Sequence, residues 1–179
     1  MKTLRVLVPV DGSLLSKAIL PQVRGLGAAP LVTVLRVIEP AASDTERLGG
    51  EVEVQDVAER LRAQGVEKVS TLVRYGKPAE QILEAAREVD AGAIAMVTHG
   101  RTGYDRLVVG SVAERVIRAS PLPVLALRAA EPVPLDSPAA PLLERIVVPY
   151  DGSEVAWRAV ELLALLGVAG RVTLLGVTE

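Results

Sequence analysis

Short apolar segments alternate with amphipathic segments along the first 128 residues. Five segments rich in Val, Leu, Ile and Ala have the length of buried strands: 4–10, 31–38, 69–75, 93–97 and 124–128. Nearly continuous apolar runs are typical of parallel strands that are covered on both faces. The pattern therefore predicts five strands in one largely parallel sheet.

Segments whose apolar residues fall at helical spacing lie between these strands. Predicted helices follow Ser13, span 51–64 and begin at Pro78 and at Ser111. In the first helix we expect Leu14, Ala18, Ile19 and Val23 to be buried, with a kink or an early end at Pro21. Residues 40–50 are expected to form an irregular loop. The order of elements predicts an α/β fold: an open, mainly parallel five-stranded sheet with helices on both faces.

A partial repeat of the opening sequence follows a segment rich in Pro and Ala. RVLVPVDGS at 5–13 returns as RIVVPYDGS at 145–153, and LVTVLRVIE at 31–39 returns as RVTLLGVTE at 171–179. We therefore expect a domain at 1–128, a linker at 129–143 and a truncated β-α-β repeat at 144–179. A lone β-α-β unit cannot bury both faces of its strands, so we expect it to dock on the first domain or on the same segment of another chain.

Composition excludes several classes of function. The net charge is −2 and only 2% of the residues are aromatic, which argues against a nucleic-acid-binding surface. The absence of Cys excludes disulfides and thiolate chemistry, and no His, Asp or Glu cluster has the spacing of metal ligands. No apolar run has the length of a membrane span and the first residues lack a secretory signal, so a cytoplasmic protein is expected.

The stretch 93–119 is the strongest candidate for chemistry. An apolar strand runs into a loop with Gly100, Gly103 and Gly110, and a helix begins at Ser111. The first amides of a helix lack partners within the helix and can bind a phosphate, which glycines allow to approach closely. The alternatives are an ordinary loop after a strand and a purely structural N-cap at Ser111. The spacing fits neither the Walker pattern nor G-x-G-x-x-G.

Four separated motifs resemble the universal stress protein family. They are VPVDGS at 8–13, THGRTG at 98–103, GSVAERV at 110–116 and PLPVL at 121–125. The resemblance covers 4–128 in family order and resumes over 144–179. It implies an adenine-nucleotide α-hydrolase-like fold, commonly dimeric, whose ATP-binding members carry the pattern G-x-x-G, nine residues, then G-S/T.

The resemblance also implies a set of site residues. Triphosphate would lie on the amides of Gly100, Arg101, Gly110, Ser111 and Val112, with Met96 and His99 beside the same loop. Adenine and ribose would be held by Pro9, Val10, Asp11 and Val37.

One position departs from the family pattern. Val97 stands where ATP-binding members have the first glycine, and its branched side chain would obstruct a close approach of the ligand. Met96 and Val97 fit a second interpretation equally, in which both are strand core. His99, the single histidine, fits a structural loop role as well as a phosphate contact, and Arg101 fits an exposed surface position as well as a phosphate contact.

The sequence thus predicts an ATP-binding regulatory or stress-response module. Any Mg²⁺ is expected to arrive with ATP, and because no general base is evident we expect slow hydrolysis at most and assign no catalytic residue. The alternatives are a nucleotide-free dimeric adaptor in which Val97 impairs the site, and an adenylating enzyme. The resemblance further implies a homodimer that pairs through the edge strand at 124–128.

Overall fold

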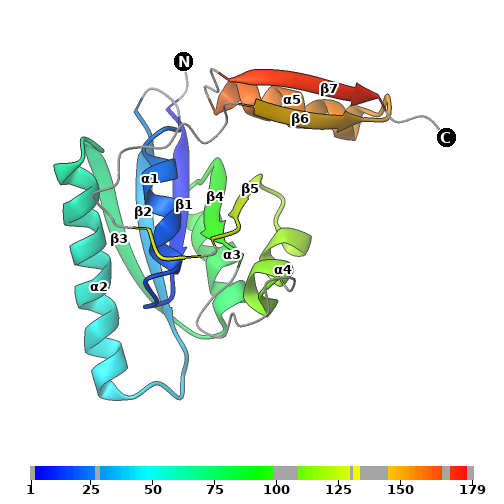
Figure 1. Cartoon of the computed structure of the whole chain (residues 1–179). Coiled ribbons are helices and arrows are strands. Elements are labelled where there is room, and N and C mark those ends of the chain that lie inside the picture. The colour runs from blue at the N-terminus through cyan, green and yellow to red at the C-terminus, as the bar shows by residue number, and fades with distance from the viewer. Residues whose placement is uncertain are drawn as a thin grey trace.

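A computed structural model describes residues 3–26, 29–98, 109–129, 131–133, 145–166 and 170–176 (Figure 1). The predicted linker lies largely outside these residues, as does the glycine loop between 99 and 108.

The predicted sheet is present, and its five strands are parallel. In chain order they are β1 (Arg5–Val10), β2 (Leu31–Ile38), β3 (Lys68–Tyr75), β4 (Ala93–Val97) and β5 (Val124–Leu127). Their order across the sheet is β3-β2-β1-β4-β5 (Figure 1). The chain therefore adds β2 and β3 on one side of β1 and then adds β4 and β5 on the other side.

Helices cover both faces of this sheet. They are η1 (Ser16–Ile19), α1 (Leu20–Val23), α2 (Asp44–Ala63), α3 (Pro78–Glu88) and α4 (Ser111–Ala119). Alternate strand residues divide between two buried clusters. Val6, Val8 and Val34 pack with residues of η1, α1 and α2, whereas Leu7 and Leu35 pack with residues of α3 and α4. This division is what a parallel sheet buried on both faces requires.

The prediction of an irregular loop at 40–50 is wrong in its second half. Helix α2 begins at Asp44 because Ser43 and Glu46 form a capping box: the Ser43 hydroxyl accepts from the Glu46 amide, and the Glu46 carboxylate accepts from the Ser43 amide. The spacing of apolar residues does not predict this start of α2, because Leu48, an apolar residue near it, is exposed.

Two local expectations about helix starts are also corrected. Leu14 is 67% exposed, because residues 11–15 form a turn before η1 rather than the first turn of a helix. Gly110, not Ser111, is the N-cap of α4.

The C-terminal segment forms the predicted β-α-β unit: β6 (Arg145–Tyr150), α5 (Glu154–Leu165) and β7 (Arg171–Gly176) (Figure 1). Strands β6 and β7 are parallel in the register of β1 and β2, since Arg145 pairs with Arg171 as Arg5 pairs with Leu31. Trp157 of α5 makes an edge-to-face contact with Tyr150 of β6 at 6.0 Å between ring centroids.

The end of α5 contacts the first sheet. Leu166 is buried in the same cluster as Leu4 and Val6, and Leu162 packs against that cluster. The expected docking on the first domain therefore occurs at this end of the unit. Every residue of β7, in contrast, is exposed.

Candidate functional site

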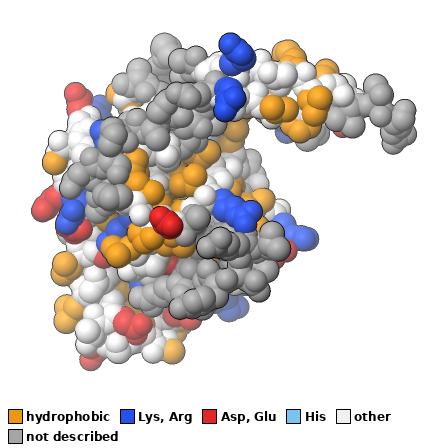
Figure 2. Space-filling model, viewed as in Figure 1, with side chains coloured by type: hydrophobic (Ala, Val, Ile, Leu, Met, Phe, Trp, Pro, Cys, Tyr) orange, Lys and Arg blue, Asp and Glu red, His pale blue; other side chains and the backbone are white. Residues whose placement is uncertain are grey.

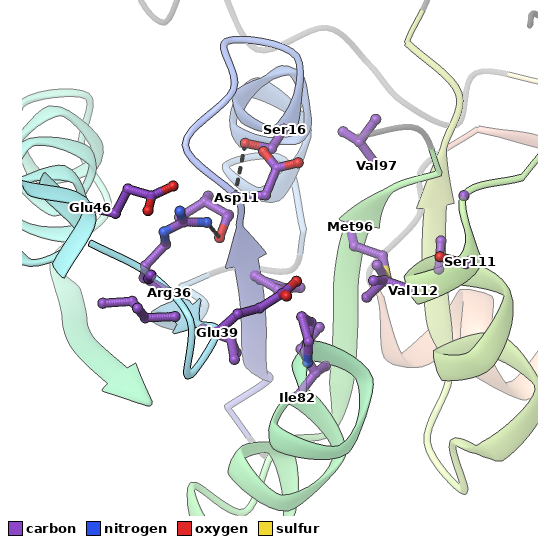
Figure 3. A pocket seen from close by; sticks show the side chains of 18 of the residues that line it. Asp11, Ser16, Arg36, Glu39, Glu46, Ile82, Met96, Val97, Ser111 and Val112 are labelled. Atoms are coloured by element: carbon purple, nitrogen blue, oxygen red, sulfur yellow. Dashed lines mark hydrogen bonds between the residues drawn. The ribbon is translucent and has the colours of Figure 1, made fainter. Parts of the chain in front are cut away.

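A cavity of about 520 Å³ opens at the carboxyl ends of β1, β2 and β4 (Figure 3). This volume lies in the range of small-molecule sites. The cavity lies at the point where the strand order reverses, because β2 and β4 flank β1 on opposite sides. Ligands of open α/β sheets bind at such a switch point.

Asp11 follows β1 directly, and the turn after it is tied together by hydrogen bonds. The Ser13 hydroxyl and amide donate to Asp11 Oδ1 at 2.6 and 2.9 Å. The Asp11 amide donates to Ser16 Oγ at 3.3 Å, and Gly12 has the φ of 88° that favours glycine. The turn therefore holds the carboxylate at the cavity (Figure 3).

Burial by itself would raise the pKa of Asp11. The hydrogen bonds from Ser13 and Ser16 and the positive charge of Arg36 together outweigh it, so that the pKa lies below its ordinary value. Asp11 is therefore ionised at neutral pH and can accept hydrogen bonds from ribose hydroxyls or from an exocyclic amine.

Behind Asp11 lies a cluster of three charged side chains from three elements. Glu53 of α2 lies between Lys17 of η1, at 3.4 Å, and Arg36 of β2, at 3.6 Å. The side chains of Glu53 and Arg36 are only 9% and 11% exposed. Arg36 also donates to the Val10 carbonyl at 3.5 Å. The cluster thus fixes a guanidinium beside the last residue of β1.

The amino end of α4 forms the opposite wall. Its N-cap, Gly110, supplies no side-chain hydrogen bond to the first turn, and its amide donates to the Thr98 carbonyl at 2.7 Å. Ser111 and Val112 follow, and both line the cavity. The wall therefore presents the positive end of a helix whose first amides have no side-chain cap.

Met96 and Val97 point to opposite sides of β4 (Figure 3). Met96 lies towards Ser111 and Val112 of α4 (Figure 3). Val97 is 8% exposed and packs in the cluster shared with η1 and α1, although it also borders the cavity. The structure thus gives Val97 a core role and keeps its side chain off the α4 side of the strand.

Eight of the residues singled out from the sequence surround this one cavity: Pro9, Val10, Asp11, Val37, Met96, Gly110, Ser111 and Val112. His99, Gly100 and Arg101 lie outside the described residues.

Sequence reasoning missed further lining residues, namely Ser16, Arg36, Glu39, Glu46, Ile82 and Thr98. Arg36 could have been found, because it is the one charged residue inside the apolar run 31–38. Glu39 follows β2 as Asp11 follows β1, and this equivalent position at the sheet edge was also a usable signal.

The model of the universal stress protein family matches residues 2–128. The chain belongs to the universal stress protein family. A universal stress protein of Methanocaldococcus jannaschii is 44% identical over 61 residues, which are 34% of this chain and 36% of that relative. This universal stress protein thus spans about a third of the length of that curated relative.

Solved structures of the family share its fold. A universal stress protein from Archaeoglobus fulgidus matches all of this chain and 69% of its own, at 24% identity and a TM-score of 0.78. Another A. fulgidus member, solved in complex with dAMP, matches 70% of this chain and 98% of its own, at 23% identity and a TM-score of 0.53.

Within its described residues, this universal stress protein has no helix long and apolar enough to cross a membrane. The same part of the chain brings no three His, Cys, Asp or Glu residues together as a metal site.

We predict that Asp11→Asn lowers the free energy of unfolding by about 1 kcal/mol at neutral pH, because an amide oxygen accepts the Ser13 hydrogen bonds less strongly than a carboxylate. Since the folded pKa is depressed, this stabilisation is present above the unfolded pKa of about 4 and is lost as the pH falls through the lower folded value. Urea unfolding of the wild type and of Asp11→Asn at a series of acid pH values measures the difference between their free energies of unfolding, which is expected to shrink as the pH falls.

The matched control is Asp151→Asn. Asp151 accepts the same hydrogen bond from the amide of Ser153 at 2.9 Å but lies in the open, so its loss is expected to be smaller. A wild-type advantage at Asp11 that stays constant down to the lowest pH would contradict the prediction.

Glu53→Gln is predicted to cost about 3 kcal/mol of unfolding free energy, because it leaves Lys17 and Arg36 buried without their counter-charge. Glu51→Gln, an exposed neighbour on α2, is the control and is expected to change stability by less than about 0.5 kcal/mol. Denaturant titration measures the free energy of unfolding of both variants. Equal losses of stability would show that Glu53 does not compensate the charges of Lys17 and Arg36.

Proposed function

We propose that this universal stress protein is a regulatory module that binds an adenine nucleotide, with ATP as the ligand and Mg²⁺ arriving with it. One observation carries the proposal. A single cavity joins an ionised carboxylate at the end of β1 to the uncapped amino end of α4. A nucleotide needs both features, because its ribose and base offer donors and its phosphates are anions.

The lining residues fit this ligand from one end to the other. Pro9, Val10 and Val37 supply apolar edges for a purine, and Asp11 supplies the acceptor for ribose or amine. Ser111 and Val112 supply amides for phosphate, whereas the Gly110 amide, also expected to bind phosphate, already donates to the Thr98 carbonyl. His99, Gly100 and Arg101 are proposed to complete the phosphate end. The family member solved with dAMP supports the chemical class.

Two statements from the sequence belong to the same proposal. The chain is proposed to be cytoplasmic, where adenine nucleotides are abundant, and to be divided into the parts 1–128, 129–143 and 144–179. Self-association is proposed as well. Its candidate surfaces are the edge of β5 and a face of the C-terminal unit.

Calorimetric titration with ATP and Mg²⁺ tests the site directly. We expect a dissociation constant in the micromolar range, on the order of 10 µM. Gly110→Val, which places a branched side chain at the amino end of α4, is expected to weaken binding at least about tenfold, and Asp11→Asn about fivefold. Asp151→Asn, the equivalent change in the C-terminal unit, is expected to leave binding unchanged.

Protein freed of carried-over nucleotide and verified by its absorbance is essential to this titration. No heat from such protein with ATP, ADP or AMP would reject the nucleotide module and favour the second candidate, the nucleotide-free adaptor.

Val97 is the observation that favours the adaptor, because it borders the cavity where ATP-binding members have glycine. We nevertheless predict that Val97→Gly changes the dissociation constant for ATP by less than about threefold, since the Val97 side chain packs on the η1 and α1 side of β4. Val97→Ala is the control for lost core packing. Binding that appears only in Val97→Gly would establish the adaptor for the native chain.

A further inference from the structure

Helix α2 buries one of its acidic side chains. Figure 2 shows charged side chains over the surface of this helix, where water surrounds them. The side chain of Glu53, in contrast, is only 9% exposed, and it lies between Lys17 and Arg36. Buried ion pairs can often be replaced by apolar residues without loss of stability. Glu53 does not border the cavity either, so contact with a ligand does not account for its charge.

The same helix restrains the whole side chain of Arg36. A Cβ atom added at Gly50 would lie 3.1 Å from Arg36 Cγ, so α2 lies directly on the aliphatic part of this side chain. Nearly one turn further along the helix, Glu53 Oε2 faces Arg36 Nε at 3.6 Å. The position of the guanidinium beside the end of β1 is therefore determined from α2.

Few hydrogen bonds hold this guanidinium. The distance to Glu53 is too long for a hydrogen bond, and among the described residues the buried Arg36 Nε has no hydrogen-bond partner. The hydrogen bond from Arg36 Nη1 to the Val10 carbonyl is long, at 3.5 Å. Because a guanidinium carries five N–H donors, Arg36 retains donors for a stronger acceptor.

A stronger acceptor follows Val10 directly. Burial alone would raise the pKa of Asp11, but serine hydrogen bonds and then the charge of Arg36 lower it, so the carboxylate is ionised. Figure 3 shows Arg36 extending from β2 towards Asp11. Arginine and carboxylate groups readily form two parallel hydrogen bonds. Such a pair would occupy the acceptor that the ribose needs, yet in the structure the ion pair of Arg36 is with Glu53.

We propose that Glu53 is a positioning residue of the nucleotide site: it holds Arg36 away from Asp11 and so leaves the Asp11 carboxylate for a ribose hydroxyl. This inference rests on the proposed function. Glu53 acts through Arg36 and touches no ligand, while Lys17 supplies the second cation, so that two cations balance two carboxylates. With a neutral residue in place of Glu53, Arg36 would turn to Asp11 and close the ribose end of the cavity.

Calorimetric titration with ATP and Mg²⁺ tests this role. Glu53→Gln is expected to weaken binding about fivefold, the loss expected of Asp11→Asn, because both changes remove the same acceptor. Combining the two changes is expected to add no further loss. Glu53→Asp keeps the charge and is expected to regain most of the affinity. Glu51→Gln, at an exposed position of α2, is the control and is expected to bind as the wild type does.

Two double variants separate positioning from stability. Glu53→Gln leaves two cations without their counter-charge, and a second change, either Arg36→Met or Lys17→Met, relieves the same excess of charge. Both double variants are therefore expected to regain stability to a similar extent in urea unfolding. Only Arg36→Met removes the group that would pair with Asp11, so only this double variant is expected to bind ATP within about twofold of the wild type. The double variant with Lys17→Met is expected to stay about fivefold weaker.

A change in the ligand gives a second check. 2′,3′-Dideoxy-ATP has no ribose hydroxyl that could donate to Asp11. Its affinity is expected to change by less than about twofold on Glu53→Gln, although the same variant binds ATP about fivefold more weakly. A general disturbance of the cavity would weaken the binding of both ligands alike.

A crystal structure of Glu53→Gln without ligand tests the position of Arg36 itself. We expect a guanidinium nitrogen within about 3 Å of an Asp11 carboxylate oxygen, in place of the hydrogen bond to the Val10 carbonyl.

These experiments separate the positioning role from the proposed function. No binding of ATP by the wild type would reject the proposed function, and the crystal structure would then decide alone whether Glu53 holds Arg36 away from Asp11. Binding by the wild type that Glu53→Gln leaves unchanged would overturn the positioning role alone. Equal recovery of affinity in the two double variants would also overturn it, as would an Arg36 that remains on the Val10 carbonyl in the crystal.

Discussion

The arrangement of this protein depends on β1 having a parallel strand on each side. A parallel neighbour requires a crossover, and crossovers are right-handed, so helices that follow β1 and β2 cover one face while α3 and α4 cover the other. Where the chain changes from one side of β1 to the other, the carboxyl ends of the strands separate and leave a crevice. The cavity bounded by Asp11 and α4 is a consequence of this topology.

The crevice has a charged support that lies deeper than its walls. Arg36 would be an expensive residue at the end of a buried strand, but Glu53 of α2 compensates its charge and Lys17 compensates that of Glu53. The result is a fixed positive charge beside Asp11, and that charge helps to keep the carboxylate ionised. The wall of the cavity and the packing of α2 are therefore coupled through one ion-paired group.

The sequence was most informative where burial alone decides the structure. Continuous apolar runs predicted all five strands of the first sheet, because a parallel strand covered on two faces has no polar side. The internal repeat predicted both strands of the C-terminal unit. It was least informative where local hydrogen bonds decide. The capping box at Ser43 begins α2 inside a segment without apolar spacing, and the Ser13–Ser16 turn leaves Leu14 exposed.

The residues of the candidate site also fall into those that the sequence could predict and those that it could not. Positions at strand ends, such as Pro9, Asp11 and Val37, could be named because the resemblance covers them and topology brings them together. Glu46 could not be named, since its place at the cavity depends on the first turn of α2, which was not predicted.

The repeated motif separates what a short sequence determines from what its surroundings determine. Asp11 and Asp151 each accept the amide of a serine two residues later at 2.9 Å, and Gly12 and Gly152 have φ values of 88° and 87°. The turn that follows the strand is therefore the same in both copies, although η1 and α1 follow it in the first and the longer α5 in the second. Yet Leu7 is fully buried and Val147 is exposed, and in the described residues only the first copy has a β4 and an α4 beside it. A cavity at the strand ends and a buried sheet face both require those neighbours, so the same motif borders a cavity in the first copy and lies in the open in the second.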